Sequence, residues 1–237
     1  MARRVAIVKL LARMDPPVED PEGALADQRV LVDGAVVTNP ASQVLPSARV
    51  VVKPPRRPRG AQKLGAALDR FGVAVAGRVG LDLGACTGGF TQALLDRGAA
   101  RVFAVDVGFG QLLGSLRQDP RVVSLERTNV ADVTPGLLGT LPGVVVVDVT
   151  KLSLREVVRQ LADHEVPGSG TELVGLVKPL FELGIGELPE GEELARALRL
   201  AEAGLVDAGW EHLGSMESPM RGHRGAVEFF VHARWPD

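Results

Sequence analysis

Apolar and polar positions follow two different periodic patterns along the chain, and the first is typical of β-strands. In residues 1–53 the short β-branched runs Arg29-Val-Leu-Val and Ala35-Val-Val-Thr flank the pair Asp33-Gly34. This combination is typical of two strands joined by a tight hairpin turn. A third run, Arg49-Val-Val-Val, follows, and residues 3–13 are expected to form a short helix. The segment is therefore predicted to be a small α+β domain.

From residue 61 onward, short apolar runs alternate with helical ones. The pattern predicts strands at residues 78–83, 101–106, 122–126, 143–149, 172–177 and 227–233, and helices at residues 63–71, 89–97, 112–117 and 192–208. Apolar strands that alternate with helices indicate a mostly parallel sheet covered on both faces. Residues 61–237 are thus predicted to form a doubly wound, Rossmann-like α/β domain, which binds ligands at the C-terminal ends of its strands.

A basic, proline-rich segment at residues 54–60 is predicted to link the two domains. Prolines there favour an extended chain and oppose a helix. Residues 49–59 hold five basic and no acidic side chains, although the whole chain has a net charge of −2. This concentration of charge is equally consistent with a solvated linker and with a segment that contacts phosphates.

Composition narrows the class of protein. Apolar residues make up 46% of the chain, enough for a large core, and no apolar run approaches the length of a membrane span. The N-terminus lacks the pattern of a secretory signal. Cys86 is the one cysteine, which excludes a disulfide framework and a cysteine-rich metal site. We expect a cytoplasmic protein with no membrane partner and no metal.

The most informative run is Leu81-Asp-Leu-Gly-Ala-Cys-Thr-Gly-Gly-Phe-Thr-Gln, which links a predicted strand to a predicted helix. Gly84 can adopt the backbone angles of a tight strand exit, and Gly88-Gly89 allows a ligand to approach the backbone closely. A glycine-rich turn by itself also fits a nicotinamide or flavin dinucleotide.

Two further features bear on the choice of cofactor. Asp106 ends the next strand, 22 residues after Gly84, where a carboxylate accepts hydrogen bonds from a ribose diol. That diol is common to S-adenosylmethionine (SAM), NAD and FAD. The loop, however, lacks the spacing Gly-x-Gly-x-x-Gly, and Asp82 would repel a diphosphate but suits the cationic end of SAM. The sequence therefore favours SAM.

Several motifs in order resemble the haemolysin-A (TlyA) type of FtsJ-like ribosomal RNA ribose 2′-O-methyltransferases. Besides the glycine-rich run they are Val105-Asp-Val-Gly-Phe-Gly-Gln-Leu, Glu126-Arg-Thr-Asn-Val, Val147-Asp-Val, Leu176-Val-Lys-Pro and Val227-Glu-Phe. The resemblance implies that residues 1–53 are an RNA-binding domain of ribosomal-protein type and that residues 61–237 are the SAM-dependent methyltransferase domain. It also implies ribosomal RNA or a ribosomal subunit as the partner.

The resemblance implies the site residues as well. The family's Lys-Asp-Lys-Glu catalytic tetrad falls on Lys63, Asp148, Lys178 and Glu228. Lys178 is expected to act at the substrate hydroxyl, with Asp148 and Glu228 orienting it. The expected cofactor-binding residues are Asp82, Gly84, Ala85, Cys86, Thr87, Gly88, Gly89, Phe90, Asp106, Val107, Asn129, Val130 and Asp148, and the expected substrate-binding residues are Lys151, Arg221 and Arg224.

Departures from the family pattern cluster where RNA would bind. Lys151 stands where the family has a phenylalanine, and the loop after Glu182 is acidic. Acidic residues also occupy the region where a basic recognition helix is expected, at Asp15, Glu19, Asp20, Glu22 and Asp27. These changes leave two alternatives open: a methyltransferase for a small molecule, such as a tailoring enzyme of natural-product biosynthesis, and a protein that binds SAM without transferring a methyl group.

Overall fold

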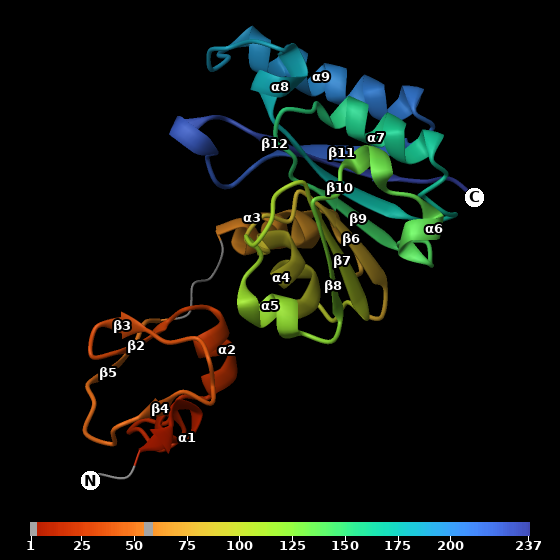
Figure 1. Ribbon diagram of the computed structural model, residues 1–237. Helices are drawn as coiled ribbons and strands as arrows, with labels where there is room; N and C mark the ends of the chain where they lie inside the picture. The colour runs from red at the N-terminus through yellow and green to blue at the C-terminus, as the bar shows by residue number, and fades with distance from the viewer. Residues whose placement is uncertain (1–3, 55–58) are drawn as a thin grey trace. The chain divides into compact units, whose positions relative to one another are not determined.

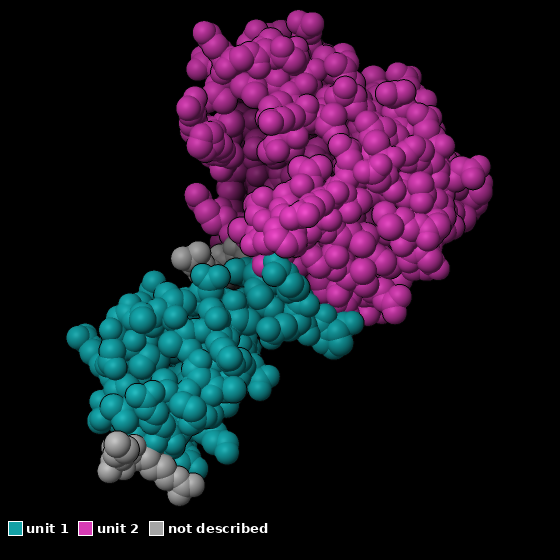
Figure 2. All heavy atoms as spheres, in the orientation of Figure 1, with its two compact units in different colours: residues 1–57, 113–120 teal, residues 58–112, 121–237 magenta. Residues whose placement is uncertain are grey.

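The computed structural model describes residues 4–54 and 59–237, and the chain divides into two compact units. Unit 1 comprises residues 1–57 and 113–120, and unit 2 comprises residues 58–112 and 121–237 (Figure 2). Most of the predicted linker, including Arg56 and Arg57, lies outside the described residues. Its last two residues are already helical, because α3 (Arg59–Phe71) begins four residues earlier than predicted.

Unit 1 is a small α+β structure. Its elements are β1 (Val5–Ala6), α1 (Ile7–Leu11), α2 (Pro21–Ala26), β2 (Val30–Val32), β3 (Ala35–Val36), β4 (Gln43–Val44) and β5 (Val50–Val52), together with α5 (Gly114–Gln118). The predicted hairpin is confirmed, since Asp33 and Gly34 both have positive φ, at 51° and 85°, between β2 and β3. The helix expected at residues 3–13 is shorter, because Val5 and Ala6 pair with β4 as β1.

Helix α2 lies within the acidic, proline-containing stretch, for which the hydrophobic pattern predicts no helix. Asp20 is its N-cap and accepts a hydrogen bond from the Gly23 amide at 2.9 Å, and Pro21 occupies the first helical position. Both residue types favour a helix start at these positions. At least one of the acidic side chains in this region therefore stabilises the local fold.

Unit 2 contains the mostly parallel sheet that the sequence predicts. Its seven strands lie in the order β11-β12-β10-β9-β6-β7-β8. Strands β6 (Val79–Leu83), β7 (Arg101–Asp106), β8 (Val122–Glu126), β9 (Val144–Val147) and β10 (Glu172–Val177) are parallel, and β12 (Phe229–Arg234) is antiparallel to β10 and to β11 (Glu211–Glu217). Strand β11 was not predicted, because it is a largely polar edge strand with a half-exposed side-chain pattern.

Helices cover both faces of this sheet (Figure 1). On one face α7 (Leu154–Asp163) packs with α9 (Glu192–Asp207), and on the other α3 packs with α4 (Gly89–Asp96). The short helices α6 (Pro135–Leu138) and α8 (Pro179–Leu183) and the 3-10 turns η1 (Val130–Asp132) and η2 (His223–Gly225) complete the unit. No helix in the described ranges is both long and apolar enough to cross a membrane.

Side chains alternate between the two helical layers along each strand. In β6, Leu81 and Leu83 belong to the core cluster that contains α7 and α9 side chains. Asp82, between them, instead contacts Thr91 of α4. The same alternation therefore buries a carboxyl group on the α4 side of the central strand.

Candidate active site

Three of the four predicted catalytic residues flank strands that are neighbours in the sheet. Asp148 follows β9, Lys178 follows β10 and Glu228 precedes β12. Strands β9 and β10 are parallel, whereas β12 runs the opposite way. All three residues therefore lie at the same edge, which is the edge where doubly wound sheets gather functional groups.

The four predicted catalytic residues form two ion pairs. The Lys178 amine lies 2.6 Å from Asp148 Oδ1 and donates a hydrogen bond to the Val149 carbonyl at 2.8 Å. Glu228, which was expected to orient Lys178, instead forms its ion pair with Lys63 of α3. The Lys63 and Glu228 side chains are only 11% and 7% exposed, whereas Asp148 is 30% exposed. The Lys178–Asp148 pair is thus the more accessible to a substrate.

The loop between β11 and β12 passes tightly over Glu228. A Cβ atom added at Gly222 would lie 2.3 Å from Glu228 Oε1, so any side chain at this position would displace the carboxylate. Two predicted substrate-binding residues, Arg221 and Arg224, are exposed in the same loop, and Arg221 forms an ion pair with Glu217 at 3.3 Å. The third, Lys151, is exposed in the loop that joins Asp148 to α7 and has a φ of 72°.

The glycine-rich turn lies directly against one predicted catalytic residue, Asp148. Gly84 has a φ of +87°, and a Cβ atom there would lie 2.4 Å from the carbonyl oxygen of Asp148. Only glycine satisfies both the backbone angle and this close approach. Gly88, with a φ of 95°, is the N-cap of α4. The turn that the sequence assigns to a cofactor therefore packs against Asp148, the residue that forms the ion pair with Lys178.

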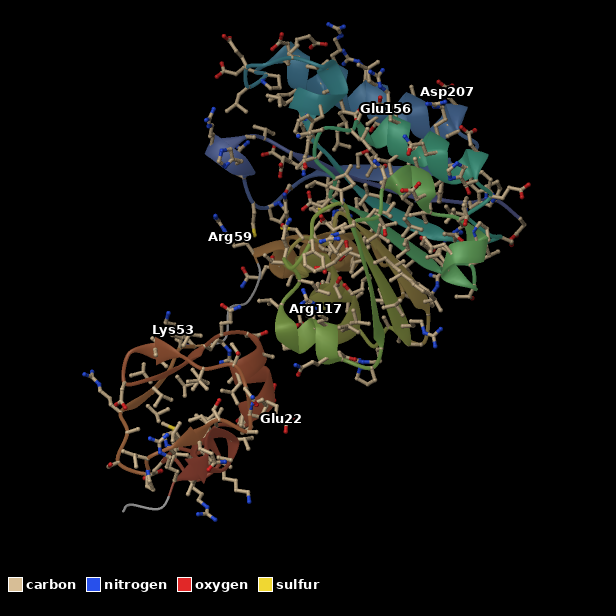
Figure 3. All side chains as sticks on the ribbon, viewed as in Figure 1. Glu22, Lys53, Arg59, Arg117, Glu156 and Asp207 are labelled. Carbon is tan, nitrogen blue, oxygen red and sulfur yellow. The ribbon has the colours of Figure 1, made fainter. Side chains whose placement is uncertain are left out.

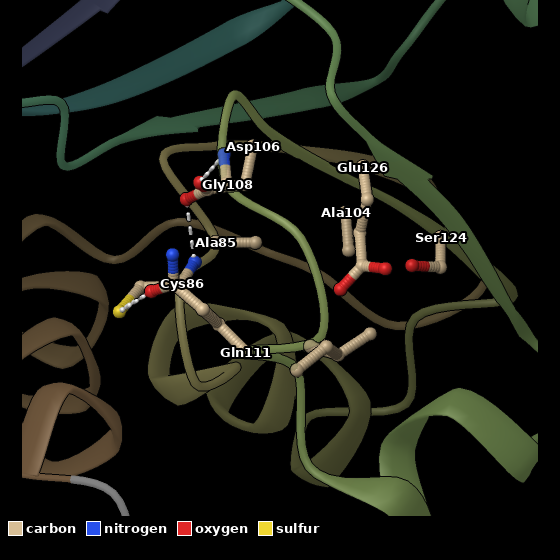
Figure 4. Close-up of a pocket in the computed structure, with 9 residues that line it drawn as sticks. Ala85, Cys86, Ala104, Asp106, Gly108, Gln111, Ser124 and Glu126 are labelled. Carbon is tan, nitrogen blue, oxygen red and sulfur yellow. Dashed lines mark hydrogen bonds between the residues drawn. The ribbon is translucent and has the colours of Figure 1, made fainter.

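Asp106 ends β7 at the edge of a small pocket (Figure 4). Its two carboxylate oxygens accept hydrogen bonds from the backbone amides of Cys86, at 2.8 Å, and Gly108, at 2.6 Å. The pocket is lined by Ala85, Cys86, Ala104, Asp106, Gly108, Gln111, Leu112, Ser124 and Glu126. A strand-end carboxylate held beside a glycine-rich turn is the arrangement that binds a ribose diol, so these residues fit the nucleoside part of SAM.

Asp82 is fully buried one residue before the end of β6. Its Oδ2 accepts a hydrogen bond from the Thr91 hydroxyl at 2.6 Å, and its Oδ1 has no hydrogen-bond partner among the described residues. Burial raises the pKa of this carboxyl to about 7, and the Thr91 hydrogen bond opposes the shift. A nearby cation would stabilise the ionised form, which fits the positively charged end of SAM.

Four of the predicted cofactor-binding residues have structural contacts. A Cβ atom at Gly89 would lie 2.9 Å from the Gly60 backbone of α3, and Phe90 is buried beside Phe230. The Asn129 side chain caps η1, whose first residue, Val130, is buried. By contrast, Thr87 and Val107 are exposed. Cofactor contact by these six residues, and by the other predicted cofactor-binding residues, stays a prediction.

Six residues that line the pocket were not among the predicted site residues: Ala104, Gly108, Gln111, Leu112, Ser124 and Glu126. Gln111 accepts a hydrogen bond from the Cys86 thiol at 3.2 Å, and Glu126 accepts one from the Gly110 amide at 2.8 Å. Glu126 ends β8 as Asp106 ends β7. The rule that points to Asp106, a carboxylate at a parallel strand end, would also have identified Glu126.

Comparisons with known proteins agree with this geometry. The profile of the family described as FtsJ-like methyltransferase matches residues 56–235. The rRNA (cytidine-2′-O)-methyltransferase TlyA of Mycobacterium tuberculosis is 41% identical over 246 residues, covering 99% of this chain and 91% of the relative. Hemolysin A of Brachyspira hyodysenteriae is 33% identical, with coverage of 86% and 88%.

Among solved structures, a protein from Streptococcus thermophilus provisionally named a hemolysin matches with a TM-score of 0.72 and 30% identity, covering 100% of this chain and 90% of that one. The resemblance inferred from the motifs is confirmed, as is the predicted fold class. The chain belongs to the FtsJ-like methyltransferase family, and it is an enzyme whose methyl donor is SAM.

Proposed function

We propose that this enzyme methylates the 2′-hydroxyl of a ribose in ribosomal RNA and that Lys178 acts at that hydroxyl. The observation that carries the proposal is the Lys178–Asp148 pair, because the Asp148 backbone packs directly against the glycine-rich cofactor turn at Gly84. The full-length similarity to TlyA, which is named for cytidine 2′-O-methylation of 16S and 23S rRNA, supports the choice of substrate.

The chemistry explains why an amine is needed at this position. A ribose hydroxyl is a poor nucleophile and must lose its proton as the new bond forms. SAM, when bound, supplies an electrophilic methyl group on a positively charged sulfur. In its ion pair with Asp148, Lys178 is an ammonium that can stabilise the developing alkoxide, and it can accept the hydroxyl proton only after releasing one of its own to solvent. Asp148 and the Val149 carbonyl fix the direction of this amine, and such alignment contributes up to about 7–11 kcal/mol in favourable cases.

The other predicted residues have supporting roles in the proposal. Glu228 holds Lys63 in a nearly buried ion pair. This pair fixes α3 next to the end of the sheet where Asp148 and Lys178 lie. The exposed cations Lys151, Arg221 and Arg224 would contact RNA phosphates, which bind basic side chains strongly. In this proposal residues 1–53 form the RNA-binding domain, residues 54–60 link it, and residues 61–237 form the catalytic domain.

The test is a methyl-transfer assay with labelled SAM and purified small and large ribosomal subunits, taken from a bacterium that has no relative of this chain. We expect label in RNA and a 2′-O-methylated nucleoside after nuclease digestion and mass spectrometry. Lys178→Ala should lower the transfer rate by about 10²–10⁴-fold, the contribution typical of a general base. Its affinity for SAM, measured by calorimetry, should stay within about twofold of that of the wild type.

A matched pair of carboxylate variants provides the control. Asp148→Asn removes the partner of Lys178, whereas Asp163→Asn removes an exposed carboxylate that pairs with Arg159 at 3.7 Å on α7. Only Asp148→Asn should slow methyl transfer. Methylation of small molecules in a metabolite extract, without any labelling of RNA, would support the small-molecule alternative. SAM binding with no transfer to either would indicate a binding protein.

A further inference from the structure

Glu182 carries a buried carboxyl group that the proposed mechanism does not use. The residue lies on α8 and is only 1% exposed. One carboxylate oxygen accepts a hydrogen bond from the Leu154 amide, at the start of α7. The other oxygen has no hydrogen-bond partner among the described residues, and the nearest cation is Arg155 Nε at 3.8 Å. Such incomplete pairing costs free energy in a buried site.

Lys178 and Glu182 lie one helical turn apart and contact opposite ends of the same loop. The Glu182 amide donates to the Lys178 carbonyl at 3.1 Å, which sets the one-turn spacing. Lys178 contacts Asp148 and Val149, at the beginning of the loop of residues 148–153. Glu182 contacts Leu154, immediately after that loop. The segment that begins with Lys178 and continues as α8 is therefore bonded to the loop at two points.

Capping of α7 does not by itself account for Glu182. Ser153 and Glu156 already form a reciprocal capping box, with Ser153 Oγ 2.6 Å and the Ser153 amide 2.8 Å from Glu156 Oε2. These contacts stay within the loop and α7, whereas Glu182 connects them to α8. Burial raises the pKa of the Glu182 carboxyl to about 7, so the structure keeps this connection despite an unfavourable environment for its charge.

We propose that Glu182 is a positioning residue, which holds α8 against the loop of residues 148–153 and thereby keeps the Lys178 amine directed at Asp148. The inference rests on the proposed role of Lys178. It adds a function for a carboxylate outside the four predicted catalytic residues. Loss of the contact should leave the cofactor pocket intact, because Glu182 does not line it.

The test compares Glu182→Met with Glu156→Met in the ribosomal-subunit assay at saturating SAM. Both changes remove a carboxylate at the N-terminus of α7 and leave no strong acceptor in its place, and Glu156 is labelled on that helix in Figure 3. Glu182→Met should lower kcat by about 10- to 100-fold, the cost of a small misplacement of a reacting group. Its KM for SAM should stay within about twofold. Glu156→Met should lower the melting temperature while kcat stays close to that of the wild type.

Two additions separate positioning from a general loss of structure. Active sites are counted by SAM-binding stoichiometry, so that kcat refers to folded enzyme only. Hydrogen exchange should increase in Glu182→Met at both residues 149–153 and residues 178–183, but in Glu156→Met only near residues 153–157. Glu182→Gln, whose amide oxygen can still accept the Leu154 hydrogen bond, should show a smaller loss of kcat.

Each contrary result has a distinct meaning. Wild-type kcat per site in Glu182→Met, with Lys178→Ala impaired, overturns the positioning role alone. Equal losses of kcat in Glu182→Met and Glu156→Met also overturn it, because helix capping would then explain both. Unchanged transfer in Lys178→Ala overturns the proposed role of Lys178, and the positioning role with it.

Discussion

Asp82 is a buried side chain that lowers the stability of the fold at neutral pH and is expected to bind the cofactor. Its carboxyl is fully enclosed, and burial raises its pKa to about 7 from an ordinary value of 3.8. The folded protein therefore binds this proton more tightly than the unfolded chain does. The contribution of this group to stability is greatest at low pH and declines as the pH rises from about 4 to 7.

We expect Asp82→Asn to stabilise the ligand-free protein more at pH 8 than at pH 5. Asparagine resembles the protonated acid and can still accept the Thr91 hydrogen bond, but it never ionises. The gain in the free energy of unfolding at pH 8 should exceed the gain at pH 5 by about 2–3 kcal/mol. Urea unfolding of both proteins at both pH values measures this difference. The titration of Glu182 cancels in the comparison, because Glu182 is present in both proteins. Equal gains would mean that Asp82 ionises normally in the folded protein. SAM affinity should fall in the variant at either pH.

At the scale of elements, the packing of α3 on α4 links the cofactor turn to Lys63. Gly89 is the first residue of α4. It has no space for a Cβ atom, which would lie 2.9 Å from the Gly60 backbone. We expect Gly89→Ala to lower the free energy of unfolding by about 1–3 kcal/mol, as overpacking does, with little change in SAM affinity. Chemical unfolding and calorimetry measure the two. Gly136→Ala, whose nearest contact would be 3.8 Å away, is the control. Weaker SAM binding with unchanged stability would show that Gly89 contacts the cofactor instead.

Local pattern predicted the parallel strands well, because β-branched runs such as that of β9 are buried on both faces. It failed for β11, whose pairing with β12 and not its own hydrophobicity makes it a strand. In the candidate site too, local pattern identifies some features and misses those that depend on pairing. Strand ends and motifs pointed to Asp106 and Lys178. The pairing of Lys63 with Glu228, 165 residues later, and the contact of Glu182 with Leu154 depend on tertiary packing that no local pattern contains.

At the scale of the whole molecule, the uneven distribution of charge bears on RNA binding. The net charge is −2, yet residues 49–59 carry five basic and no acidic side chains. Within the described part of this segment, Arg49 and Lys53 are exposed, and Lys53 is labelled in Figure 3. A chain with this balance would bind a polyanion through a restricted surface and not through a general attraction.

If that segment contacts phosphates, its removal should change the salt dependence of binding more than the chemistry. Each phosphate contact contributes about 0.7–0.9 to the slope of log K against log salt concentration. We therefore expect the double variant Arg49→Ala/Lys53→Ala to lower the slope for ribosomal subunits by about 1.5, raise KM for the subunits and leave kcat unchanged. Arg159→Ala/Arg199→Ala removes the same charge from α7 and α9, where both arginines are engaged in ion pairs, and should leave the slope unchanged. Equal slopes in all three proteins would identify the basic segment as a solvated linker, because counterion release depends on contacts with phosphate and not on net charge alone.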